Sequence, residues 1–107
     1  MDLTNKKCKP CEGEVSPLNQ GEINEYKKNI RSDWIVIENN KISKEYFFVN
    51  YQHMMDFVNK VASIAEEEGH HPVMHLFYAK ALIELWTHSI NGLSENDFIL
   101  ASKIDKL

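Results

Sequence analysis

Histidine is the residue type in this chain that is best suited to chemistry, and its positions are clustered. Three of the five histidines, His70, His71 and His75, fall within six positions, and His88 follows a predicted strand. An unperturbed imidazole titrates near neutral pH, so it can both donate and accept a proton there. His70 and His71 lie at a predicted helix–strand junction, where functional side chains concentrate. These histidines are therefore candidates for acid–base catalysis.

Each histidine also has a purely structural interpretation. His53 lies in the first turn of a predicted helix, where solvent would surround it, and His75 alternates with apolar neighbours on a strand. His70 and His71 precede a proline and could be loop residues that cap a helix C-terminus. Residue type alone leaves both interpretations open for these two residues, and the same holds for His88.

A metal ion could be bound by the same cluster. Its ligands would be His70, His71 and His75, with Glu66 or Glu67 adding a carboxylate. However, adjacent histidines on an extended segment point to opposite sides. The spacing also matches neither the H-E-x-x-H motif nor a cysteine–histidine zinc pattern, so a metal site is the less favoured hypothesis.

Cysteine occurs at two positions, Cys8 and Cys11, in a Cys-x-x-Cys motif. The motif is half of a zinc ribbon or a redox pair, but no second half and no βαβ context accompanies it. Zinc held between two chains, or completed by a nearby histidine, stays open as an alternative. Otherwise the two residues are free thiols in a polar segment, 1–15, which is expected to be a flexible tail.

Capping signals predict the helices that must position the histidines. Asn19 with a glutamate three residues later resembles a capping box, and apolar residues at helical spacing predict a helix near 19–30. Asn50 can cap a second, strongly amphipathic helix that ends at Gly69. Ser94 and Asp97 form another capping box, which opens a last helix with Phe98, Ala101 and Ile104 facing inward.

Three segments with period-2 or β-prone character predict the sheet. Segments 34–38 and 41–49 flank an Asn39-Asn40 turn and predict an antiparallel hairpin. Segment 73–87 alternates and predicts two strands joined near Tyr78. Helices and strands in this order, with short connections, favour an α+β domain in which helices pack on one face of an antiparallel sheet.

Length and charge exclude several classes of protein. A chain of 107 residues is enough for one domain, expected over 16–107. The net charge of −4 lacks the basic character of a nucleic-acid-binding protein, so no nucleic-acid partner is expected. No apolar run approaches the ~20 residues that span a bilayer, and residues 1–9 lack the apolar core of a signal peptide. A cytoplasmic protein without a membrane partner is expected.

The spacing of these residues resembles that of the pterin-4a-carbinolamine dehydratases. The pattern runs from Glu66 through three residues to His70-His71-Pro72, and then to Tyr78, His88 and Asp97. The likeness extends over about 20–107, and the Cys8–Cys11 segment is similar to bacterial members associated with phenylalanine hydroxylation.

The resemblance implies a fold and an activity. It implies a four-stranded antiparallel sheet with three helices packed on one face, in a homodimer or homotetramer. Family members convert 4a-hydroxytetrahydrobiopterin to quinonoid dihydropterin and water, which recycles the cofactor of aromatic amino-acid hydroxylases. They need no metal or organic cofactor. The pterin substrate and an aromatic amino-acid hydroxylase are the expected partners.

The resemblance also assigns residue roles. His70 and His88 are expected to be the acid–base pair, His71 to position the pterin, and Glu66 to orient a histidine. Further residues are expected to bind or orient the substrate: Gly69, Trp86, Thr87 and Asp97. Asp97 could instead serve only as the capping residue of the last helix. Gly69 replaces an acidic residue that many members carry, so no side-chain contact is expected from that position.

A different class of function remains open. The chain could be a non-enzymatic dimerising module, or a regulator of a hydroxylase or a transcription factor. Such a module would use the sheet face that carries Leu82 and Trp86, together with a strand edge.

Overall fold

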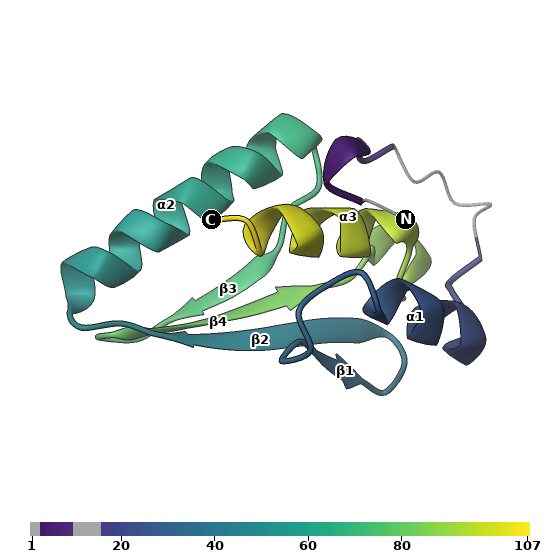
Figure 1. Ribbon diagram of the computed structural model, residues 1–107, viewed down its shortest axis with the longest axis horizontal. Coiled ribbons are helices and arrows are strands. Elements are labelled where there is room, and N and C mark those ends of the chain that lie inside the picture. Colours follow the sequence, from purple (N-terminus) through teal and green to yellow (C-terminus); the bar gives the residue numbers. More distant parts are fainter. Residues whose placement is uncertain (1–2, 10–15) are drawn as a thin grey trace.

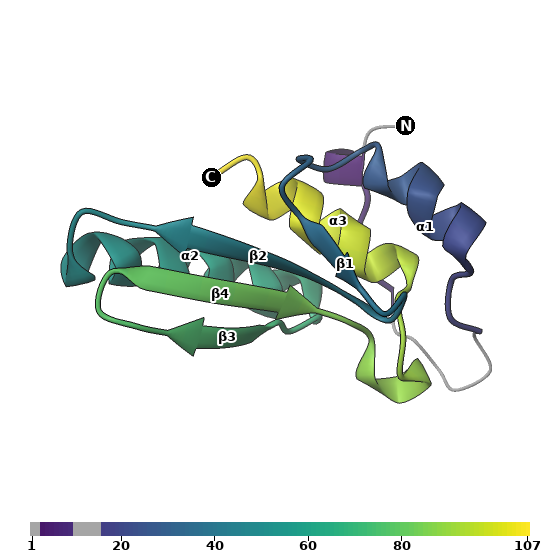
Figure 2. The ribbon, with the colours of Figure 1, turned by 90° about the horizontal axis from the view of Figure 1, so that it is seen from below.

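The computed structural model describes residues 3–9 and 16–107, and in them the four strands form one antiparallel sheet. The strands are β1 (Ile35–Ile37), β2 (Lys41–Phe47), β3 (Val73–Leu76) and β4 (Lys80–Leu85), in the spatial order β1-β2-β4-β3. The helices α1 (Gln20–Lys27), α2 (Tyr51–Glu68) and α3 (Glu95–Ile104) complete the α+β fold. Figure 1 shows α2 and α3 above the sheet, and Figure 2 shows the opposite face uncovered. The predicted fold class is confirmed.

Local capping explains where the helices begin and end. The Asn19 side chain accepts a hydrogen bond from the Glu22 backbone N–H, and the Asn19 backbone N–H donates one to the Glu22 carboxylate, which is the predicted capping box. Asn50 caps α2, and Gly69 ends it in the left-handed conformation with φ of 65°, which favours glycine. The first helix stops at Lys27, three residues earlier than predicted.

The β1–β2 hairpin turns one residue earlier than predicted. Glu38 and Asn39, rather than Asn39 and Asn40, adopt positive φ, and the Asn40 N–H donates to the Ile37 carbonyl. This turn sets the register in which Ile37 pairs with Lys41. β2 also ends at Phe47, two residues before the predicted limit.

The core lies between the sheet and the helices. The inward residues of the last helix are buried as predicted, and Trp34 joins them with its ring N–H donating to Asp105. Alternate residues of β4 (Ala81, Ile83 and Leu85) are fully buried beneath the helices. This packing fixes the C-terminal end of α2 against the N-terminal end of α3, where the predicted site residues are found.

Residues 3–9 contradict the expectation of a flexible tail over this part of 1–15. A short 3-10 helix, Leu3–Asn5, packs against α3, and Leu3 is only 1% exposed. A buried leucine and several hydrogen bonds to distant residues hold the segment, which a polar composition does not reveal. We call residues 3–9 the strap. Cys11 lies outside the described residues, so the Cys8–Cys11 pair stays a prediction.

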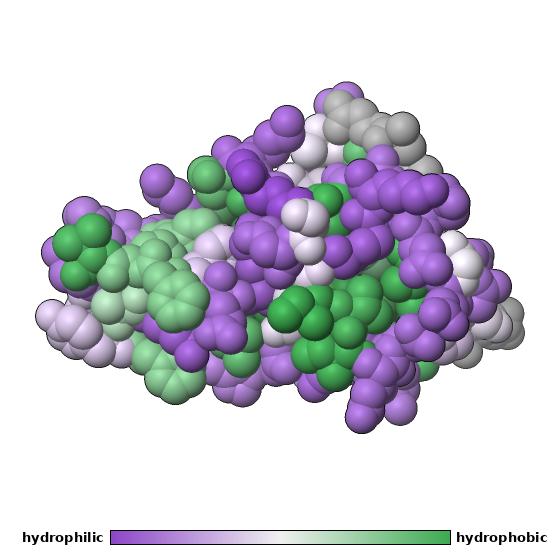
Figure 3. All heavy atoms as spheres, turned by 60° about the horizontal axis from the view of Figure 1, so that its bottom comes forward, coloured by the Kyte–Doolittle hydropathy of each residue, from purple (hydrophilic) through white to green (hydrophobic). Residues whose placement is uncertain are grey.

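Exposed apolar side chains gather at one end of the molecule. They lie at the β3–β4 turn and at the connection from β2 to α2: Phe47, Val49, Tyr51, Leu76, Phe77 and Tyr78. Figure 3 shows this apolar end at the left. Helix α2 begins at this apolar end, and Gly69 and the histidine pair lie at the other end of the helix. In the described residues, no helix is long and apolar enough to span a bilayer.

Candidate active site

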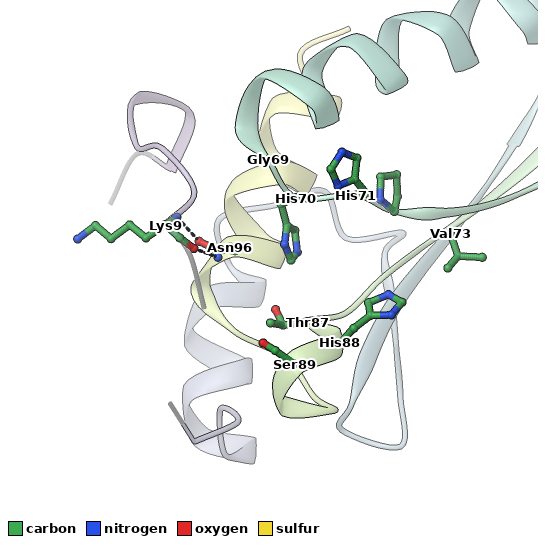
Figure 4. Close-up of a pocket in the computed structure, with 10 residues that line it drawn as sticks. Lys9, Gly69, His70, His71, Val73, Thr87, His88, Ser89 and Asn96 are labelled. Carbon is green, nitrogen blue, oxygen red and sulfur yellow. Dashed lines mark hydrogen bonds between the residues drawn. The ribbon is translucent and has the colours of Figure 1, made fainter. Parts of the chain in front are cut away.

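A cleft of about 430 Å³ opens where α2, α3 and the end of β4 meet. Such a volume is within the range of small-molecule sites. Figure 4 shows His70 and His71 on one side of it, with Thr87 and His88 on the other. The predicted residues among its lining are Gly69, His70, His71, Thr87 and His88. Three imidazoles from two separate segments therefore share one cleft.

His70 is held by a buried carboxylate. Its Nε2 lies 2.6 Å from Asp97 Oδ1, and its side chain is 11% exposed whereas that of Asp97 is 0% exposed. The Asp97 Oδ2 accepts hydrogen bonds of 2.9 Å from the Thr87 hydroxyl and the Ser94 backbone N–H. Because donors surround the Asp97 carboxylate, it acts as the acceptor for His70, and the His70 Nε2 carries the proton of this hydrogen bond. Nδ1 is then the His70 nitrogen left for chemistry.

Asp97 has the capping role that the sequence predicts, and its carboxylate also contacts a cleft imidazole. It is the N3 residue of the capping box that starts α3, and it also contacts His70. The Thr87 hydroxyl, which donates to Asp97, is buried and also lies 2.7 Å from the Ser94 hydroxyl. One carboxylate thus fixes a helix terminus, a strand end and a cleft imidazole together.

His88 is oriented by an aromatic stack. Its ring lies against that of Trp86 with centroids 4.3 Å apart and planes 13° apart. The Lys41 ammonium lies 5.2 Å from the Trp86 ring centre. Trp86 itself lines a separate shallow hollow with Asn40, Lys41 and Asn91 rather than the cleft. The structure therefore places Trp86 outside the cleft and against the His88 ring.

The loop that carries His88 is closed at its base. The Thr87 N–H donates to the Gly92 carbonyl over 2.8 Å. A Cβ at Gly92 would lie 2.7 Å from the Pro17 Cβ, a separation that requires glycine or a shift of the chain. This close approach holds the loop beside the segment that precedes α1.

His71 and His75 each contact a different carboxylate. His71 Nε2 lies 2.9 Å from Glu66 Oε1, both exposed, and His75 Nε2 lies 2.8 Å from Glu84 Oε1 on the sheet. Within 3–9 and 16–107, no group of three metal-ligating side chains comes together. The histidines that cluster in the sequence thus contact three different carboxylates in space.

A family model described as pterin 4 alpha carbinolamine dehydratase matches residues 16–107. The chain belongs to this family. A protein of Rickettsia bellii, named for an inferred pterin-4-alpha-carbinolamine dehydratase activity, is 45% identical over 105 residues, which cover 98% of this chain and 93% of that protein. A protein of the same name from Nitrosomonas europaea is 47% identical over 106 residues, or 99% of this chain and 93% of the relative.

Solved structures of pterin dehydratases share the fold. A crystal structure of a transcriptional coactivator/pterin dehydratase from Brucella melitensis has a TM-score of 0.78 and 27% identity, and the match covers 85% of this chain and 97% of that one. A pterin dehydratase-like protein described as a RuBisCO assembly factor has a TM-score of 0.59, and the match covers 69% of this chain and 87% of that one. At 21% identity this second likeness concerns the fold alone.

Lys9 and Asn96 are among the cleft residues that sequence reasoning missed. The two residues line the cleft together. The backbone N–H and carbonyl of Lys9 form a reciprocal pair of hydrogen bonds with the side-chain amide of Asn96. Figure 4 shows the Lys9 ammonium pointing away from the histidines. Nothing in the local sequence marks this pair, because the two residues are 87 positions apart.

Burial of Cys8 leads to a prediction about its reactivity. Burial, then the nearby Glu68 carboxylate, raises the pKa of this thiol to about 12. Because the thiolate is the reacting form, we expect iodoacetamide to alkylate native Cys8 at least ~100-fold more slowly than the unfolded chain at pH 8. Peptide mapping separates Cys8 from Cys11, and equal rates in native and unfolded protein would contradict the prediction.

Proposed function

We propose that this protein catalyses the dehydration of a pterin-4a-carbinolamine to quinonoid dihydropterin and water. The convergence of His70, His71 and His88 on one cleft is the observation that carries the proposal. Membership in the dehydratase family supports the same reaction. In the cytoplasm this activity would recycle tetrahydrobiopterin for an aromatic amino-acid hydroxylase.

The reaction needs two proton transfers on neighbouring atoms. The C4a–O bond breaks as the hydroxyl takes a proton and leaves as water. N5 gives up its proton to a base, and its electrons form the C4a=N5 double bond. A paired acid and base can supply about 10²–10⁴-fold acceleration to such a step. In our proposal His70 and His88, on opposite sides of the cleft, form this pair.

Asp97 would act through His70. Its carboxylate accepts from Nε2–H, which fixes the ring orientation and leaves Nδ1 to exchange a proton with the substrate. It would also stabilise the ring when it carries a positive charge. This arrangement makes Asp97 a positioning residue.

His71 and Glu66 would position the pterin rather than transfer its protons. Their contact is solvent-exposed at the rim of the cleft. Gly69 and Thr87 would form the wall near the substrate, with the glycine contributing only backbone. No step in this mechanism requires a metal ion or an organic cofactor.

A direct assay tests the proposed function. Purified protein should accelerate the spectrophotometric decay of a 4a-carbinolamine generated in situ, and excess EDTA should leave the rate unchanged. A rate equal to the uncatalysed decay would contradict the proposal. Loss of the rate on chelation would instead indicate a metal-dependent site.

Trp86→Leu tests the support behind His88. We expect kcat to fall about 5–10-fold because the imidazole loses its stacking partner and samples more orientations. Leu82→Ala is the matched control. Leu82 lies in β4, the strand that leads to Trp86, but it has no ring contact with His88. Equal kcat values for the two variants would remove Trp86 from the mechanism.

A non-enzymatic role is the second candidate. The uncovered sheet face carries Ile35, which is 64% exposed, and the Brucella relative is named as a coactivator as well as a dehydratase. An interaction module would bind a hydroxylase in pull-down experiments and would leave carbinolamine decay unchanged. The proposed dehydratase would accelerate that decay without any partner.

A further inference from the structure

The strap, residues 3–9, lies outside the part of the chain that the family model matches, yet it contacts both elements that carry the His70–Asp97 pair. Leu3 anchors its start in the core. Lys6 forms an ion pair of 2.7 Å with Glu95, the first residue of α3. The strap thus follows α3 toward the cleft.

At its end the strap joins α2 to α3. The Cys8 N–H donates to Glu68 Oε1 over 2.9 Å, and Glu68 is the last residue of α2. The other Glu68 oxygen accepts 2.6 Å from Lys103 of α3. Burial alone would raise the pKa of Glu68, but the hydrogen bonds from Lys103 and Cys8 outweigh it and lower this pKa. The carboxylate is therefore charged at neutral pH and connects three segments.

The next residue of the strap holds the first turn of α3. The Lys9 N–H donates to Asn96 Oδ1 over 2.9 Å, and Asn96 Nδ2 donates to the Lys9 carbonyl over 2.6 Å. Asn96 is buried and directly precedes Asp97. The Cys8 thiol adds a weak contact of 3.5 Å to the Asn96 carbonyl.

These contacts lie one or two residues from the pair that the proposed mechanism depends on. Glu68 is two residues before His70, and Asn96 is one residue before Asp97. Apart from the strap, the polar contacts between these two chain ends in the described residues include the Lys103–Glu68 and His70–Asp97 pairs, in addition to the apolar core that α2 and α3 share. Misplacement of a catalytic group by about 1 Å can cost about 10²-fold in rate.

We propose that the strap is a positioning element for catalysis, which holds His70 in register with Asp97 by tying the end of α2 to the start of α3. This inference rests on the proposed dehydratase function. Lys9 and Asn96 at the same time form one wall of the cleft. The strap is thus part of the working site, although the family model begins at residue 16.

A pair of substitutions at one strap residue tests this inference. Cys8→Pro removes the N–H that donates to Glu68, whereas Cys8→Ala keeps it and removes only the thiol. We expect Cys8→Pro to lower kcat at least about 5-fold, and Cys8→Ala to stay within about 2-fold of the wild-type value. Both substitutions lie in the strap and leave every residue of α2, α3 and the sheet unchanged.

A second variant and a second readout keep the test decisive. Asn96→Ala should lower kcat and speed the alkylation of Cys8, because both hydrogen bonds to Lys9 are lost. In proton NMR of full-length Cys8→Pro, the His70 Nε2–H signal should exchange with water faster than in the wild type. Wild-type kcat and wild-type exchange in Cys8→Pro would overturn the inference.

The two proposals can fail separately. If the wild-type chain does not accelerate carbinolamine decay, the proposed function fails, and the exchange of the His70 Nε2–H still reports on the strap. If the wild type is active and Cys8→Pro is equally active with a protected His70 signal, only the strap proposal fails.

Discussion

His70→Ala is expected to lower kcat for carbinolamine dehydration by about 10²–10⁴-fold, which is the range that a positioned acid or base contributes. The imidazole is the cleft group that a buried carboxylate holds in one orientation. Its loss removes a proton-transfer group and leaves Asp97 without its cleft partner. Stopped-flow decay of the carbinolamine, corrected for the uncatalysed rate, gives the measurement.

His75→Ala is the matched control for this variant. His75 also contacts a carboxylate, Glu84, but does so on the sheet outside the cleft. We expect its kcat to equal that of the wild type. If His70→Ala retains wild-type activity, or if His75→Ala loses as much, the assignment of the acid–base site is wrong.

Asp97→Asn is expected to lower both activity and stability. The asparagine has nearly the same shape, but its NH2 group replaces one carboxylate oxygen, so a donor then faces either His70 or the donors of Thr87 and Ser94. A buried donor facing a donor costs about 1–3 kcal/mol of folding free energy. Because His70 faces either a donor or an uncharged acceptor in place of the carboxylate, we expect kcat to fall about 10²-fold or more.

Thr87→Val provides the graded comparison. It removes one of the donors around Asp97 and leaves the contact with His70 intact. Its kcat should fall less than that of Asp97→Asn, with denaturant midpoints measured for both variants. An Asp97→Asn protein with wild-type kcat would show that His70 does not depend on the carboxylate.

Features that depend on neighbouring residues could be predicted from the sequence. The Asn19–Glu22 capping box and the stop at Gly69 are local interactions, and the structure contains both. The hairpin turn was predicted one residue late, because local preference favours Asn40 over Glu38 for positive φ. The cross-strand pairing of Ile37 with Lys41 selects between them.

Features that depend on distant contacts could not be predicted. The resemblance assigned His70 and Asp97 to one site, but their spacing of 27 residues does not reveal a hydrogen bond between them. The strap is the clearest case, since a polar segment with one leucine has no internal signal of docking. Its partners Glu68 and Asn96 lie 60 and 87 residues away from it.

The apolar end of the molecule has a practical consequence for immobilisation. Its exposed aromatic and aliphatic side chains, Val49 at 83% among them, lie at the start of α2, whereas the cleft lies beyond the other end of this 18-residue helix. A hydrophobic support would adsorb the molecule by these side chains. Adsorbed in that orientation, the protein would keep its cleft turned toward the bulk liquid, so soluble pterin could enter and leave freely.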